Sequence, residues 1–108
     1  MRGLRSRVFE LRLPRLAGTR EAAVDLLDAQ DVPRDLRTAD VVVFCDDLAT
    51  GSASFADELV RQVLTERHGG HLVLVGAPRS FWTRVSEAAG RRGVRDRVSQ
   101  RAAAAATR

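Results

Sequence analysis

The sequence predicts an α/β domain with a central, mostly parallel sheet, a mixed edge and about three helices. Two apolar runs, residues 40–45 and 71–76, have the composition of buried strands. Segments with a helical period of apolar residues lie before, between and after them. This alternation is typical of parallel strands joined by right-handed helical crossovers. At 108 residues the chain has room for one such domain.

The first half of the chain predicts a strand, a helix and a second strand. Residues 7–13 alternate loosely between polar and apolar side chains and then meet Pro14, which indicates a strand with one solvent-exposed face. Thr19 stands where it can cap a helix, and Pro33 closes that segment. The run 40–45 then predicts a central strand that is buried on both faces.

The second half repeats this order. Ser54 precedes a helix predicted over residues 55–67, with apolar side chains on one face and charged ones on the other. The buried strand 71–76 follows, and a third helix ends at Gly90. Residues 94–98 predict a short edge strand. The expected organisation is a basic tail (1–6), one domain (7–98) and a tail rich in alanine and arginine (99–108).

Charge is distributed unevenly along the chain. All 18 basic residues are arginine, and the first 20 and last 18 residues each carry a net charge of +5. The segment between them carries −6. Basic termini leave open a nucleic-acid-binding accessory domain, provided that both termini converge on one face. The arginines of this alternative are Arg2, Arg5, Arg7, Arg91, Arg92, Arg95 and Arg97.

No residue set points clearly to catalysis. Cys45 is the single cysteine and ends a predicted buried strand, where a thiol is usually structural, and it has no partner for an internal disulfide. A small enzyme or metal site at Asp46, Asp47 and His71 is a further alternative. Because the catalytic candidates are so few, we expect a non-enzymatic protein without a cofactor. No apolar run approaches the length that spans a membrane, and a single cysteine fits a reducing cytoplasm, so we expect a cytoplasmic protein.

Two serines stand before the second helix. Ser54 is followed by Asp57, which matches the capping-box spacing and predicts that Ser54 is the helix cap. Ser52 lies two residues earlier in a loop, where a phosphate would sit near free N–H groups at the helix start. The nearby acids, Asp46 and Asp47 among them, would repel that phosphate.

The segment DVVVFCDDLATGSASFADELVRQVL resembles the middle of a STAS-like bacterial family of unknown function, related to the STAS domains of anti-sigma factor antagonists. The upstream GTREAAVDLL resembles the first helix region of that family, and the similarity covers about residues 7–98. In the antagonists a loop of the form Asp-Ser-Ser-Gly-Leu opens a helix, and its first serine is phosphorylated by a partner kinase. By this resemblance Ser52 takes the acceptor position, Gly51 stands where the family has an acid, and Phe44 stands at the strand-end Asp.

The resemblance implies a STAS-like fold and a regulatory protein–protein interaction module. Its partner would be a GHKL-type ATPase that resembles an anti-sigma factor kinase, and ATP and Mg²⁺ would belong to that partner. We expect binding through the loop 46–54 and the start of the helix 55–67, where an acidic surface would meet arginine or lysine. The expected binding residues are Asp46, Asp47, Thr50, Ser52, Ser54, Asp57 and Glu58.

Overall fold

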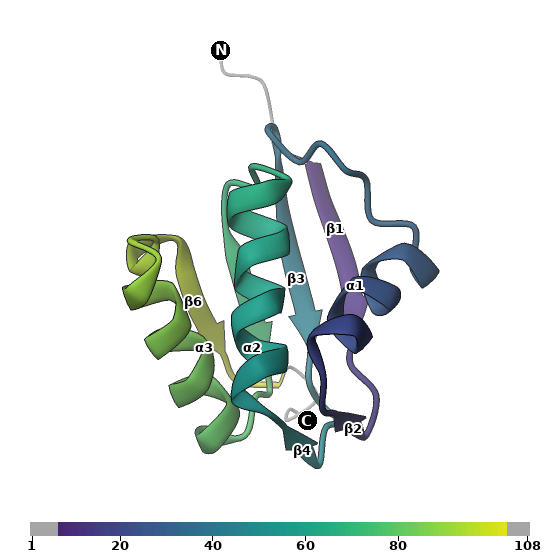
Figure 1. The fold of residues 1–108 in the computed structure, drawn as a ribbon, viewed down its shortest axis with the longest axis vertical. Coiled ribbons are helices and arrows are strands. Elements are labelled where there is room, and N and C mark those ends of the chain that lie inside the picture. Colours follow the sequence, from purple (N-terminus) through teal and green to yellow (C-terminus); the bar gives the residue numbers. More distant parts are fainter. Residues whose placement is uncertain (1–6, 104–108) are drawn as a thin grey trace.

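A computed structural model describes residues 7–103 as one sheet with helices packed against it (Figure 1). In chain order the elements are β1 (Arg7–Arg12), β2 (Leu16–Ala17), α1 (Arg20–Ala29), β3 (Ala39–Phe44), β4 (Thr50–Gly51), α2 (Ala53–Val60), the π-helical η1 (Arg61–Glu66), β5 (Leu72–Val75), α3 (Arg79–Arg91), the 3₁₀ turn η2 (Arg95–Arg97) and β6 (Val98–Arg101). The predicted α/β architecture is confirmed. Among the described helices none is long and apolar enough to cross a membrane.

The main sheet has four strands in the order β1-β3-β5-β6, and every described pair in it is parallel. The prediction of a mixed edge was therefore wrong. Each strand of this sheet is separated from the next by a helix, and a crossover of that kind returns the chain in the same direction. A second, two-stranded parallel sheet joins β2 to β4 below the carboxyl ends of the main strands (Figure 1).

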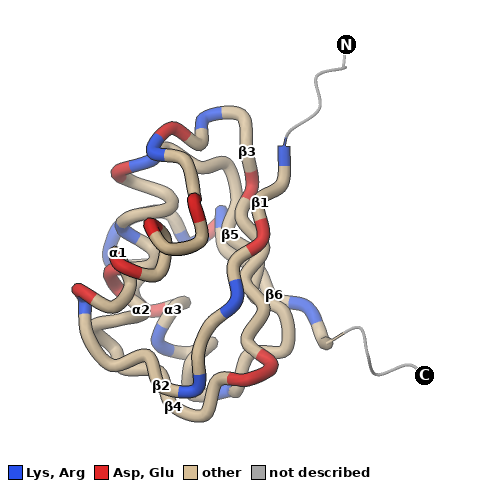
Figure 2. The backbone as a smooth tube through the Cα atoms, turned by 90° about the vertical axis from the view of Figure 1, so that its right-hand side faces the viewer, with Lys and Arg blue, Asp and Glu red and all other residues tan. Residues whose placement is uncertain are grey.

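All three α-helices lie on one face of the main sheet (Figures 1 and 2). The strand order follows the chain order, so every right-handed crossover falls on the same side. β3 is central, as predicted, but only one of its faces is covered by helices. We name the two sides of the sheet the helix side and the open side.

The core lies between the sheet and the helices. Leu11, Val43 and Leu74 point to the helix side and are fully buried. Phe55 of α2 and Phe81 of α3 meet above them, with ring centroids 6.2 Å apart. Alternate residues of β1 remain exposed, which confirms its predicted solvent-exposed face.

Two elements differ from their predicted form. The edge strand expected at residues 94–98 begins at Val98 instead, and residues 95–97 form a 3₁₀ turn. The helix expected over 55–67 is α-helical to Val60 and then π-helical, with the N–H of Arg67 bonded to the carbonyl of Gln62, five residues back. Arg67 is only 2% exposed and donates to the carbonyl of Val32 at 2.9 Å, which ties this wider turn to the loop after α1.

Candidate functional site

The loop expected to bind a partner is fixed by backbone pairing. Leu16 pairs with Thr50 and Ala17 pairs with Gly51 in the parallel β2–β4 ladder. The N–H of Ser52 donates to the carbonyl of Ala17 at 2.9 Å, which extends the ladder to the start of α2. This end of the molecule, where parallel strands finish, is a common binding position in α/β folds.

Gly51 is held against α3. A Cβ at this position would stand 2.5 Å from a ring carbon of Phe81, which is 1% exposed. Arg84 also donates to the carbonyl of Gly51 at 2.8 Å. Gly51 allows the loop to approach the buried ring, which explains why an acidic side chain does not fit here.

Ser52, and not Ser54, caps α2. The Ser52 Oγ accepts a hydrogen bond from the N–H of Phe55 at 3.0 Å and donates to the carbonyl of Gly18 at 2.9 Å. The prediction that Ser54 is the cap was wrong, since Ser54 already lies within the helix. The bond to Gly18 also links the start of α2 to the segment before α1.

Four of the remaining predicted residues lie at the surface of this end. Asp46, Asp47, Thr50 and Ser54 are all exposed. Leu16, the pairing partner of Thr50, is 70% exposed and adds an apolar side chain beside them. The exposed and partly exposed members form what we call the loop surface: Asp46, Asp47, Thr50, Ser52 and Ser54.

Asp57 is turned away from that surface and is nearly buried, with 8% exposure. Arg92 binds it with two hydrogen bonds of 2.9 and 2.8 Å, and Arg20 donates to it at 2.7 Å. The bonds from Arg92 hold the pKa of Asp57 well below its usual range, burial opposes that effect, and Arg20 adds to it. Asp57 therefore joins the start of α1 to the end of α3, across α2.

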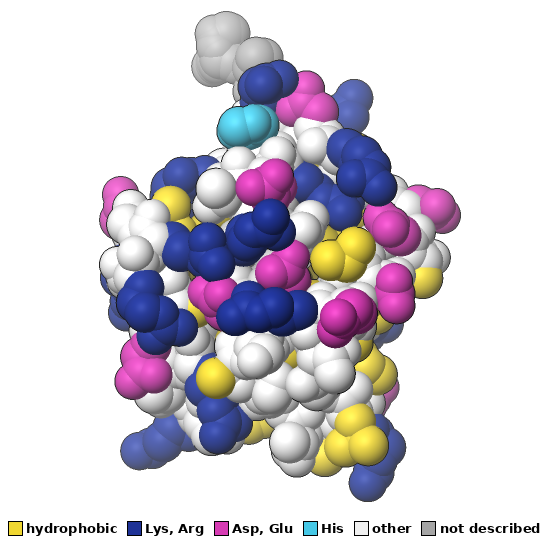
Figure 3. Space-filling view, viewed as in Figure 1, with side chains coloured by type: hydrophobic (Ala, Val, Ile, Leu, Met, Phe, Trp, Pro, Cys, Tyr) yellow, Lys and Arg dark blue, Asp and Glu magenta, His cyan; other side chains and the backbone are white. Residues whose placement is uncertain are grey.

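Glu58 is held in the same way. Arg61 and Gln62 each donate to its Oε2 at 2.8 Å, and Arg20 approaches its Oε1 at 3.4 Å. Burial raises the pKa of Glu58, but the bond from Gln62 and the charge of Arg61 outweigh it and leave the pKa lowered. Figure 3 shows the resulting alternation of arginine and acidic side chains across the helix side. Both acids are engaged within the chain.

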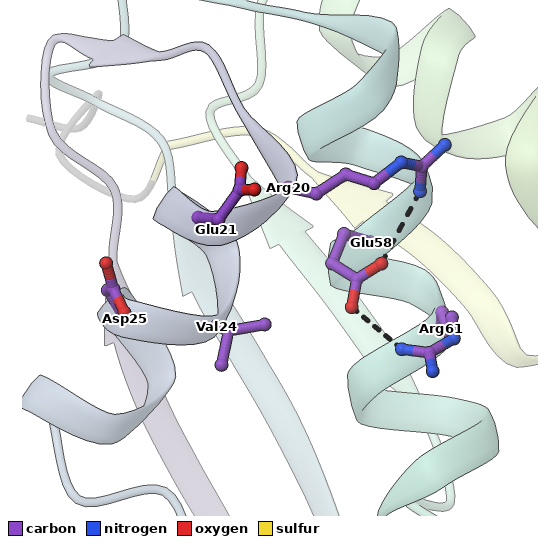
Figure 4. Close-up of a pocket in the computed structure, with 6 residues that line it drawn as sticks. All are labelled: Arg20, Glu21, Val24, Asp25, Glu58 and Arg61. Atoms are coloured by element: carbon purple, nitrogen blue, oxygen red, sulfur yellow. Dashed lines mark hydrogen bonds and ion pairs between the residues drawn. The ribbon is translucent and has the colours of Figure 1, made fainter.

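A groove of about 420 Å³ lies beside Glu58, between α1 and α2. Figure 4 shows Arg20 and Arg61 directed at the Glu58 carboxylate from two sides, with Val24 projecting from α1 toward α2. The guanidinium groups in the groove are paired with a carboxylate of its own wall. The groove therefore offers little unpaired positive charge to an anionic ligand.

The alternative metal or enzyme site is not assembled. His71 precedes β5 and lies at the amino end of the sheet, whereas Asp46 and Asp47 follow the carboxyl end of β3. Within residues 7–103 no group of three or more His, Cys, Asp or Glu residues could hold a metal ion. Cys45 is 1% exposed, and burial, aided by the charge of Asp46, raises the pKa of its thiol to about 12. A thiol of that kind is a poor nucleophile at neutral pH.

The arginines of the nucleic-acid alternative are largely used inside the fold. Arg92 binds Asp57, and Arg95 stacks on the Trp82 ring at 5.4 Å. Arg97 donates to backbone carbonyls at the end of η1 and in the glycine turn after it.

The remaining arginines of that set do not complete a common face. Arg7 begins β1, whereas Arg91 ends α3, next to the opposite edge strand β6. Arg2 and Arg5 lie outside the described residues. The convergence that a nucleic-acid surface requires is not present among residues 7–103.

The sequence reasoning missed Arg20 and Arg92 as partners of Asp57. Both lie more than 30 residues from it, so no local spacing indicates the contact. Comparison with protein-family models, curated proteins and solved structures gave no match. What the loop surface does must therefore be inferred from its own geometry and chemistry.

Proposed function

We propose that this chain is a non-enzymatic regulatory module that binds a protein partner through the loop surface. The resemblance to anti-sigma factor antagonists favours a GHKL-type ATPase as that partner and Ser52 as the residue it phosphorylates. Asp46 and Asp47 favour a partner that presents arginine or lysine, since both acids are exposed and form no ion pair among the described residues.

The observation that carries this proposal is the double hydrogen bond of the Ser52 hydroxyl. The hydroxyl hydrogen goes to the carbonyl of Gly18, and the oxygen accepts from Phe55. A phosphate on Oγ has no hydrogen to donate at neutral pH, so Gly18 would lose its partner. It would also bring up to two negative charges close to an acidic loop. Phosphorylation at Ser52 would thus both loosen the loop and change its charge.

The test is affinity capture from the native host with the wild-type chain, followed by binding measurements with the recovered ATPase. We expect Ser52→Asp to weaken binding by about tenfold or more, a difference of about 1.4 kcal/mol. Ser54→Asp separates the two effects, because it adds the same charge to the loop surface two residues away and leaves the bond between Ser52 and Gly18 in place. Equal effects of the two variants would remove the switch.

A second measurement addresses the phosphorylation directly. The purified ATPase, incubated with ATP, Mg²⁺ and the wild-type chain, is expected to place one phosphate on Ser52, located by peptide mass mapping. Ser52→Ala should then stay unmodified. Recovery of no kinase-like protein, or modification only elsewhere, would contradict the proposed partner class.

A further inference from the structure

The open side of the sheet carries a row of apolar side chains that no described helix covers. β3 and β5 place Val42, Phe44, Val73 and Val75 there, since their alternate residues face the helices. Phe44 and Val73 are partly exposed and Val8 on β1 is 57% exposed, whereas Val42 and Val75 retain only 9% and 5% exposure between their neighbours in the sheet. All-parallel sheets are almost always covered on both faces. This face, on which no helix of residues 7–103 packs, is therefore a place where a second layer should pack.

The register of the strands arranges the middle of this face in two rows across the sheet, and a shorter row of Val8 and Asp40 lies nearer the amino ends. The first row, from β1 to β6, is Glu10, Val42, Val73 and Ser99. The second row, one step nearer the carboxyl ends, is Arg12, Phe44, Val75 and Arg101. The Arg12 guanidinium stacks 4.7 Å from the Phe44 ring centroid, so the second row is packed side by side.

At the β1 edge the two rows carry opposite charges, with Glu10 in the first row and Arg12 in the second. A two-fold axis that runs across the strands, between the rows, lays the first row of one copy over the second row of another. Glu10 then faces Arg12, Ser99 faces Arg101, and apolar side chains face one another over β3 and β5. Two sheets packed in this way lie about 10 Å apart, which glutamate and arginine side chains can span.

The charges at the β1 edge agree with this arrangement. Within residues 7–103 neither Glu10 nor Arg12 forms an ion pair, although the acids Asp57 and Glu58 on the helix side are paired with arginines. Figure 2 shows charged positions along the strands of the sheet. We infer that the open side binds a second copy of this chain, face to face and with the strand directions reversed.

The contact area sets the expected strength. Four strands about 4.8 Å apart, with a few residues each at about 3.3 Å, make a small face. Interfaces below roughly 1,200 Å² in total are usually weak and reversible. We therefore expect a dimer with a dissociation constant in the micromolar range. The loop surface lies at the carboxyl end and is separate from this face, so the inference does not depend on the proposed function.

The test is sedimentation velocity of the full chain from micromolar to millimolar concentration. The wild type should pass from monomer to dimer. Glu10→Arg and Arg12→Glu should each raise the dissociation constant about tenfold or more, since each sets like charges against each other. The matched control is Glu87→Arg, a charge reversal at an exposed position of α3, which should leave the dimer unchanged.

Mixing the two single variants distinguishes a second copy from any other occupant. Glu10→Arg and Arg12→Glu together should form a one-to-one heterodimer, because both contacts then pair acid with base. The double variant should dimerise as the wild type does. Circular dichroism and Trp82 fluorescence of each variant report the fold. Should a charge variant not fold, Val73→Thr, which places a hydroxyl in the apolar row, is expected to weaken the dimer instead. A wild type that stays monomeric at millimolar concentration, or a mixture without heterodimer, would overturn the inference.

Discussion

The helix side and the open side of the sheet place charge and apolar surface differently. On the helix side, fully buried side chains such as Val43 and Leu74 form the core, and the acids above them, Asp57 and Glu58, are bound by arginines. On the open side, Phe44 and Val73 are partly exposed, and the edge strand β1 carries Glu10 and Arg12, which form no ion pair among the described residues. The fully buried core is therefore on the helix side, and the partly exposed apolar residues of β3 and β5 are on the open side.

The largest difference in stability is expected between a valine shortened on the helix side and a valine shortened on the open side. Val43→Ala removes two methyl groups from a fully buried position and should lower the free energy of unfolding by about 2 to 3 kcal/mol. Val73→Ala, on the open side, should cost less than about 1 kcal/mol at concentrations where the chain is monomeric. Urea denaturation measures both. Equal losses would show that the open side is covered within the monomer.

The next largest difference in stability is expected when one acid on each side is neutralised. Asp57→Asn should lower the free energy of unfolding by about 2 kcal/mol, because Arg92 and Arg20 lose the charge they bind at a nearly buried position. Glu10→Gln, on the open side, should change it by less than about 0.5 kcal/mol. Thermal melts of the two variants beside the wild type decide the matter. A similar loss from Glu10→Gln would break the contrast.

Lowering the pH should weaken the ion pairs of Asp57 on the helix side. The pKa of Asp57 is lower in the folded chain than its unfolded value of about 3.9, so its carboxylate stabilises the fold above that pH. This contribution is lost as the pH falls through about 4 toward the folded pKa. Glu58 acts in the same direction. The unfolding free energy of Asp57→Asn should therefore fall less than that of the wild type between neutral pH and pH about 3. Parallel curves for the two proteins would contradict this role of Asp57.

The smallest effect concerns the two serines at the start of α2. Ser52→Ala should cost about 1 kcal/mol, because it removes the cap of the helix and the bond to Gly18. Ser54→Ala, at an exposed position inside the helix, should change stability by less than about 0.5 kcal/mol. Denaturant midpoints of the two variants provide the measurement. The reverse order would restore Ser54 as the cap.

The alternation of strands and helices could be predicted from local patterns, because each element has its own period of apolar residues. Thr19 as a cap was also predictable, and the structure confirms its bond to the N–H of Ala22 at 3.0 Å. The choice between Ser52 and Ser54 was not, since both precede the helix at a plausible distance. It depends on the carbonyl of Gly18 and on the packing of Gly51 against Phe81, which are contacts between distant segments.

The side of the sheet on which the helices lie could not be predicted from local patterns either. The run 40–45 has the apolar composition of a strand covered on both faces, and composition does not say which helix covers which face. The role of Asp57 and Glu58 was missed for a related reason. The pair of Glu58 with Arg61 follows a helical spacing, but Arg20 and Arg92 come from other helices.

The sequential strand order also affects how the chain folds. Among the strands of the main sheet, each pairs only with those that come next to it in the chain order β1, β3, β5, β6. Such a sheet can grow one strand and one helix at a time from the amino terminus as the chain is synthesised. Closing each new pairing requires a loop of only one crossover, which keeps contact order low for a parallel sheet. During synthesis the edge of β3 stays unpaired until β5 has emerged, and the edge of β5 until β6 has emerged, so in these intervals the nascent chain is open to strand addition by another molecule.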